Sequence, residues 1–141
     1  MQGAAMLKQV LMIHPLGQAA ALVFGIFNLV TGWTRRCFFL PVHINVGVMC
    51  YALTFIGSIM GVLVTRMASS KGMVLSHSFH IIVAAVFMLV LIIAASTGFM
   101  LLGRKGPQTW LHILHRYGNL SVVILFLAQF VSGLQVLATV W

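Results

Sequence analysis

The sequence predicts an all-α membrane protein, an antiparallel up-down-up-down bundle of four transmembrane helices. Of its 141 residues, 62% are hydrophobic and only 6% are charged, whereas charged residues make up about a quarter of a soluble globular chain. Four apolar runs exceed the length of about 20 residues that is needed to cross a bilayer core. The polar stretches between these runs are short, and short connections force neighbouring helices to run in opposite directions.

The four runs cover approximately residues 10–33, 42–65, 74–102 and 109–138. They lack the alternating pattern of barrel strands, and four strands cannot close a barrel, so each run is expected to be a helix. The connecting stretches TGWTRRCFFLPV, TRMASSKG and GRKGPQTW contain the Gly, Pro, small polar and cationic residues that are typical of loops. A single domain over residues 1–141 is therefore predicted.

All eight charged residues are Lys or Arg, and the chain has no Asp or Glu. The cations lie in the gaps between apolar runs rather than on a polar surface, which argues against nucleic acid as a partner. Those on the N-terminal side of the predicted membrane are Lys8, Arg66 and Lys71; those on the opposite side are Arg35, Arg36, Arg104, Lys105 and Arg116. Because cytoplasmic loops carry the excess of Lys and Arg, residues 34–41 and 103–108 are expected to face the cytoplasm.

Each of the six histidines lies within the first turn or two of a predicted span. They are His14, His43, His77, His80, His112 and His115. Ionisable residues inside a membrane segment are costly, usually face the bundle interior, and are candidates for function by default. The lack of carboxylates excludes a carboxylate proton relay in this chain, so the histidines are the groups that need an explanation.

One histidine in each span is followed 18 residues later by a glycine. The pairs are His14 with Gly32, His43 with Gly61, His80 with Gly98, and His115 with Gly133. Eighteen residues make five helical turns and rise about 27 Å, so each histidine shares a helix face with a glycine near the opposite membrane surface. In an antiparallel bundle, His14 and His80 then lie at one level with Gly61 and Gly133. At the other level, His43 and His115 lie with Gly32 and Gly98.

Two imidazoles on diagonal helices, flanked by two glycines, are typical of a site for a flat apolar cofactor. Cofactor sites in helical bundles are built from side chains on facing helices, and glycine lets a macrocycle approach the backbone. The sequence predicts two non-covalent b-type haems. His14 and His80 are the expected iron ligands on the N-terminal side, and His43 and His115 are those on the opposite side. No CxxCH motif for covalent haem attachment is present.

Simpler interpretations exist for each of these residues. A buried histidine is often a hydrogen-bonded packing residue, and glycines can reflect close helix packing. His77 with His80, and His112 with His115, form HxxH pairs of the kind seen in zinc sites, but no carboxylate is available to complete such a site. The choice within each pair depends on the glycine interval. The residues that could contact a haem propionate or a substrate, or could merely fix the topology, are His77, His112, Arg36, Arg66, Lys105 and Arg116.

These motifs resemble the cytochrome b561 family of transmembrane di-haem electron carriers. LHRYG at residues 114–118 is similar to the motif that marks the ligand histidine of the last core helix, here His115. The stretch from His80 to TGFMLL at 97–102 is similar to the third core helix. His14 and His43 fit by position and interval. The resemblance implies that the first and third helices hold one haem and the second and fourth hold the other.

The resemblance leaves some points open. SHSFH at residues 76–80 also fits the family's His-Ser-aromatic element with His77 as its histidine. Many members carry two outer helices or a fused soluble domain that this sequence does not show, so ascorbate is not assumed to be the reductant.

Three functions therefore remain open. The first is transmembrane electron transport through two haems, from a donor such as quinol or ascorbate to an acceptor on the other side, alone or with partner redox subunits. The second is a single-haem, quinone-interacting membrane anchor subunit of a larger respiratory or redox complex. The third is a non-redox structural membrane subunit.

Overall fold

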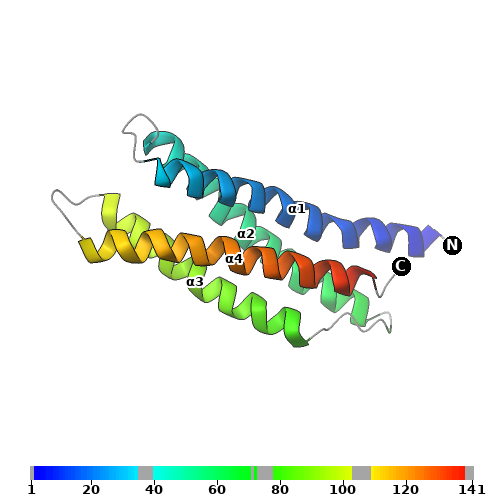
Figure 1. Cartoon of the computed structure of the whole chain (residues 1–141). Helices are drawn as coiled ribbons and strands as arrows, with labels where there is room; N and C mark the ends of the chain where they lie inside the picture. Colours follow the sequence, from blue (N-terminus) through cyan, green and yellow to red (C-terminus); the bar gives the residue numbers. More distant parts are fainter. Residues whose placement is uncertain (1, 35–39, 71, 73–77, 103–108, 139–141) are drawn as a thin grey trace.

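A computed structural model describes residues 2–34, 40–70, 72, 78–102 and 109–138, with side chains from residue 12 onward. This part of the chain forms α1 (Gln2–Trp33), α2 (Leu40–Ser69), α3 (Ser78–Leu102) and α4 (Thr109–Ala138). In Figure 1 the ends of α1 and α3 lie at the same end of the bundle as the starts of α2 and α4, and the two chain termini lie at the other end. The predicted four-helix, all-α class is confirmed.

All four helices are long and apolar enough to cross a membrane. The candidate spans are Met12–Trp33, Leu40–Ser69, Ser78–Leu102 and Thr109–Ala138. The second helix continues past the predicted end at residue 65, and the first helix begins before residue 10. The beginning of the third predicted span, residues 74–77, lies outside the described residues. Lipid requires each spanning segment to satisfy its own backbone hydrogen bonds, and an α-helix does so. With four helices of sufficient length and hydropathy, the chain is a multi-pass membrane protein.

Two local features depart from ideal helix chemistry. α1 runs through Pro15 without ending, which membrane helices tolerate because neighbouring groups satisfy the freed carbonyl. Beyond the end of α2, Gly72 adopts a φ of 77°, and its N–H donates to the carbonyl oxygen of Ser69 at 3.0 Å. Glycine suits this position because a positive φ costs it nothing.

The helices pack as two pairs. α1 lies along α2, α3 lies along α4, and the pairs meet chiefly along α1 and α4. The buried core of the bundle consists of Ala21, Leu22, Phe87, Leu91, Ala94, Val122 and Phe126. At its centre the rings of Phe87 and Phe126 lie 4.8 Å apart in a tilted arrangement.

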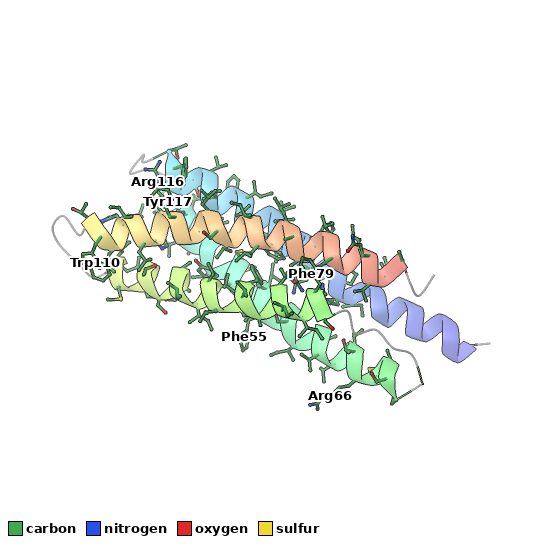
Figure 2. All side chains as sticks on the ribbon, turned by 60° about the horizontal axis from the view of Figure 1, so that its bottom comes forward. Phe55, Arg66, Phe79, Trp110, Arg116 and Tyr117 are labelled. Atoms are coloured by element: carbon green, nitrogen blue, oxygen red, sulfur yellow. The ribbon has the colours of Figure 1, made fainter. Side chains whose placement is uncertain are left out.

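The outer faces of the bundle are apolar. Phe55 is 58% exposed and Trp110 is likewise 58% exposed, and Figure 2 shows Phe55 pointing away from the bundle. Exposed large apolar side chains on all four helices would be a liability in water. In a membrane protein they are the surface that contacts lipid.

Small residues let α1 and α2 approach closely. A Cβ on Gly25 would lie 3.4 Å from Cys50 Sγ, and one on Gly47 would lie 3.3 Å from the Asn28 amide. A Cβ on Gly57 would collide with the Gln18 carboxamide. Close approach through small residues is a main source of helix association in membranes, where apolar burial gives no driving force. The contact between α1 and α2 also buries the polar side chains of Gln18 and Asn28 from α1.

Candidate functional site

The described residues of the bundle line a cavity near each of its ends. The first has a volume of about 560 Å³ and is lined by His43 and His115 together with Gly32 and Gly98. We call it the His43/His115 cavity. Its volume lies within the range of about 300–1,000 Å³ that small-molecule and cofactor sites occupy.

The second cavity lies toward the end of the bundle that holds the chain termini. It has a volume of about 570 Å³ and is lined by His14 and His80 together with Gly61 and Gly133. We call it the His14/His80 cavity. Each cavity therefore brings together the two histidines and the two glycines that the sequence places at one level.

The two imidazoles of the His43/His115 cavity lie close together in a T-shaped arrangement. Their ring centroids are 6.0 Å apart and their planes are perpendicular. His43 comes from α2 and His115 from α4, so the two helix pairs each supply one ring.

Hydrogen bonds to backbone carbonyls fix the tautomer of three of the histidines. Nδ1–H of His43 donates to the carbonyl oxygen of Asn28 at 3.0 Å. Nδ1–H of His115 donates to the carbonyl oxygen of Ala94 at 3.0 Å, and that of His14 donates to the carbonyl oxygen of Gly57 at 2.8 Å. Since a carbonyl can only accept, the proton of each neutral ring is on Nδ1. This leaves the lone pair of each ring on Nε2, as in most metal-binding histidines. At His115 the amide nitrogen of Asn119 lies 3.4 Å from this Nε2.

The glycines explain why these carbonyls can be reached. Each acceptor lies four residues before the glycine of its helix, as Asn28 lies before Gly32 and Ala94 before Gly98. A helical side chain leans toward the N-terminus and covers the turn before its own Cα. A glycine removes that cover, so the imidazole of the paired helix can settle on the exposed carbonyl.

The fit between ring and glycine is close. A Cβ on Gly32 would lie 2.8 Å from Cε1 of His43, one on Gly61 would lie 2.8 Å from Cε1 of His14, and one on Gly98 would lie 2.8 Å from Cε1 of His115. The prediction assigned these glycines to a macrocycle, and they do line the cavities. The atoms nearest to a new Cβ belong to the imidazoles, however, so their first role is to seat the histidines.

Two threonines repeat this arrangement at the His43/His115 end. Oγ1–H of Thr31 donates to the carbonyl of Asn28 at 3.0 Å, and Oγ1 lies 3.4 Å from Nδ1 of His43. Thr97 has the same relation to the carbonyl of Ala94, at 2.9 Å, and to His115, at 3.4 Å. In this cavity, the position of each histidine is thus set by a Thr-Gly dipeptide of the paired helix.

His80 is held differently. Its Nδ1 lies 2.9 Å from Oγ of Ser132, and that hydroxyl donates to the carbonyl of Gln129 at 2.9 Å. Because the serine proton is used on the carbonyl, His80 must donate from Nδ1, and its Nε2 must accept. The acceptor is already engaged, since the Gln129 amide nitrogen lies 2.9 Å from His80 Nε2.

Three buried carboxamide oxygens lack a hydrogen-bond donor among the described residues. They are Oε1 of Gln18, Oδ1 of Asn28 and Oε1 of Gln129. Gln18 is 8% exposed and lines the His14/His80 cavity, whereas Asn28 is 5% exposed and lines the other cavity. Buried acceptors without a partner are costly, so both cavities present groups that a ligand or water can satisfy.

A hydrogen bond joins the two helix pairs beside His115. Tyr51 Oη–H donates to Oδ1 of Asn119 at 3.1 Å. The amide nitrogen of Asn119 donates to the carbonyl of His115 at 2.8 Å and lies 3.3 Å from Nδ1 of the same ring. Tyr51 also lines the His43/His115 cavity, so this chain of contacts couples α2 to the ring supplied by α4.

The residues predicted to contact a propionate or a substrate lie at the edges of the cavities or outside the described residues. His112 is exposed and lines the His43/His115 cavity. Arg66 borders the His14/His80 cavity but is exposed and points away from the bundle in Figure 2. The guanidinium of Arg116 lies 4.2 Å from the centroid of the Trp33 ring, a cation–π contact. His77, Arg36 and Lys105 lie outside the described residues.

No group of three or more His, Cys, Asp or Glu side chains gathers at one point in the described ranges. A closed protein-only zinc site takes four such ligands.

Sequence reasoning missed the residues that orient the rings. The carbonyl acceptors could have been found, because they lie one turn before each glycine on the same helix face. The Thr-Gly dipeptides at residues 31–32 and 97–98 were visible as well. The contacts of Gln129, Ser132 and Tyr51 depend on which helices touch, and no pattern in the sequence indicates them.

The comparisons with known proteins found no similar protein: no family model, no curated protein and no solved structure matches this chain.

Proposed function

We propose that the chain is a transmembrane electron carrier that holds two b-type haems, as the resemblance to the cytochrome b561 family implies. The observation that carries the proposal is the pair of cavities, each lined by two histidines from diagonal helices. Three of these histidines have Nδ1 bound to a backbone carbonyl and Nε2 in the unprotonated form. That is the state in which imidazole binds a metal.

The residues fit haem in several respects. Each cavity supplies two imidazoles, which would hold the iron of a b-type haem. The walls are largely apolar, and low-dielectric surroundings together with hydrogen bonds to the ligands tune the reduction potential. When bound, haem supplies reversible one-electron exchange. The chain's own residues position the ligands, keep them neutral and exclude bulk water from the middle of the bundle.

Packed aromatic side chains lie between the two cavities. Phe87 and Phe126 line the His14/His80 cavity, and Tyr51 lines the other. Phe126 is 1% exposed and Phe87 is 2% exposed, so this partition is dry. An electron would enter near one membrane surface and leave near the other, with a quinol or ascorbate as donor and a partner redox protein as acceptor.

The first prediction concerns haem content. We expect the purified chain to contain two haems, measured as the pyridine haemochrome per mole of protein. His14→Ala or His80→Ala should remove one haem, and His43→Ala or His115→Ala should remove the other, because each substitution removes one of the two imidazoles that would hold the haem of that cavity. The two classes of variant should leave haems with different redox midpoints.

His112→Ala is the matched control, since this exposed histidine lies one turn from His115 on the same helix. It should retain both haems. Loss of haem in His112→Ala but not in His115→Ala would reassign the ligand, and a colourless chain that folds normally would leave the non-redox structural function standing.

A second function is favoured by one observation. His80 Nε2 is engaged by Gln129, and the cavity also holds the unpaired oxygens of Gln18 and Gln129. Such acceptors suit the hydroxyl groups of a quinol. The chain would then be a single-haem membrane anchor that binds quinol in the His14/His80 cavity. A haem content of one per chain, lost only in the His43 and His115 variants, would support this function over the first.

A further inference from the structure

One structural position distinguishes the surroundings of His80 from those of the other three histidines. This is the residue four places before the glycine that seats each histidine. Asn28, Gly57 and Ala94 occupy it in three helices and offer their carbonyl oxygens to a ring. In α4 the residue is Gln129, whose carboxamide also reaches the ring of His80.

The contact of Gln129 falls on the nitrogen that a metal would use. The network through Ser132 requires His80 to donate from Nδ1, so Nε2 carries the lone pair. The Gln129 amide donates to that lone pair at 2.9 Å. The corresponding contact in the other cavity is longer, since Asn119 Nδ2 lies 3.4 Å from Nε2 of His115 and donates at 2.8 Å to the His115 carbonyl. One lone pair cannot serve an N–H donor and an iron at the same time, so the two are competitors.

The Gln129 side chain can be displaced from His80 Nε2 at little cost. It is half-buried and lines the His14/His80 cavity. Its Oε1 has no donor among the described residues, so the bond to His80 satisfies only half of the carboxamide. The seat of His80 is also looser than the other three, because a Cβ on Gly133 would lie 3.2 Å from Cε1 of the ring.

We propose that Gln129 makes the two sites unequal by holding the ligating nitrogen of His80, so that the His14/His80 site binds haem more weakly and fills after the His43/His115 site. This inference rests on the proposed function. Gln129 is a positioning residue, because it acts on the ligand and not on the electron transfer itself. Displacing one hydrogen bond of this kind is worth about a two- to tenfold change in an equilibrium constant.

The experiment measures haem affinity one site at a time. Haem-free full-length chain in detergent micelles is titrated with haemin, and binding is followed by absorbance. In His43→Ala, only the His14/His80 site keeps both of its histidines. In His14→Ala, only the His43/His115 site does. Adding Gln129→Leu should strengthen binding about two- to tenfold in the first background and leave it unchanged in the second.

Two further measurements separate competition from general damage. Gln129→Leu should lower the thermal stability of the haem-free chain slightly, because a hydrogen bond is lost, while haem affinity rises. A merely structural role would lower both. In the ¹⁵N spectrum of the haem-free chain, the His80 Nε2 resonance should shift on this substitution. Gln135→Leu, at an exposed position of the same helix, should change none of these quantities.

The possible failures are distinguishable. Equal affinities at the two sites, or an unchanged or weakened His14/His80 site in Gln129→Leu, would overturn the role of Gln129 and leave the two-haem function intact. Should haem bind in no background while the chain remains folded, the proposed function and this inference fall together. A gain of the second haem only in Gln129→Leu would support the competition directly.

Discussion

The seats of the histidines depend on the missing side chains of single glycines. At Gly32, Gly61 and Gly98 the imidazole of the paired helix occupies the space of a Cβ. The ring cannot simply retreat, because its Nδ1–H is bound to a carbonyl one turn away. A methyl group at any of these positions would therefore clash with the ring. The ring could relieve the clash only by moving and breaking its hydrogen bond to the carbonyl.

We predict that Gly32→Ala or Gly98→Ala displaces one ring of the His43/His115 site. A Cβ at 2.8 Å from Cε1 is too close for van der Waals contact, so the ring moves and loses its carbonyl. The expected result is loss of one haem per chain with the other retained, measured by the pyridine haemochrome. Gly133→Ala should be milder, because its Cβ would lie at 3.2 Å.

Gly17→Ala is the control for this series. A Cβ at Gly17 meets nothing within 4 Å, and alanine is favoured over glycine in a helix interior by about 1 kcal/mol. This variant should keep both haems and be slightly more stable in thermal unfolding. If Gly32→Ala also keeps both, the close seat of His43 is not required for haem binding.

At the scale of the helix, each pair seats its own histidines, and the cavities require both pairs. α1 offers a carbonyl to His43 of α2, and α3 offers one to His115 of α4. The two rings of a cavity, however, come from different pairs. The contacts that hold the pairs together therefore control the distance across which two rings can share a metal.

Tyr51→Phe tests such a contact. The substitution removes the hydrogen bond from α2 to Asn119 of α4 and leaves an acceptor unpaired, so we expect a loss of about 1 kcal/mol in the free energy of unfolding. Because Asn119 also touches the His115 ring, the redox midpoint of the His43/His115 haem should shift more than that of the other haem.

Tyr117→Phe provides the comparison, since Tyr117 is 58% exposed on α4. It should alter neither the unfolding free energy nor either midpoint. Equal shifts at both haems in Tyr51→Phe would show that the contact acts on the bundle as a whole and not on His115.

At the scale of the whole molecule, a dense aromatic centre lies between two hollow ends. Phe126 is 1% exposed and its ring packs against that of Phe87 in a tilted arrangement. In lipid its packing energy is mainly van der Waals contact rather than removal from water. These two rings also line the inner part of the His14/His80 cavity.

Phe126→Ala should therefore destabilise the chain by about 3 kcal/mol, as large-to-small changes at buried aromatic positions do, and should loosen both cavities together. Leu127→Ala, where the native side chain is 46% exposed, should cost far less. Unfolding by denaturing detergent, followed by circular dichroism, measures both. A smaller cost in Phe126→Ala than in Leu127→Ala would contradict the assignment of the core.

The helices were predictable because lipid leaves a chain few options. A run of about 20 apolar residues must be helical in a bilayer, so residues 109–138 could be assigned from composition alone. The levels of His14, His43, His80 and His115 followed from helix geometry, since an interval of 18 residues is close to five whole turns. These are one-dimensional properties that a single helix carries by itself.

The sequence alone thus determined four candidate spans and the placing of His14, His43, His80 and His115 in pairs at two levels, because hydropathy and helical period are properties of each segment. Only the tertiary structure decided which carbonyl receives each Nδ1–H, that Gln129 holds His80, and that Tyr51 reaches Asn119. These contacts depend on how far each helix is rotated and on which helices touch. Those quantities are set by side-chain packing between segments distant in sequence, and no local pattern encodes them.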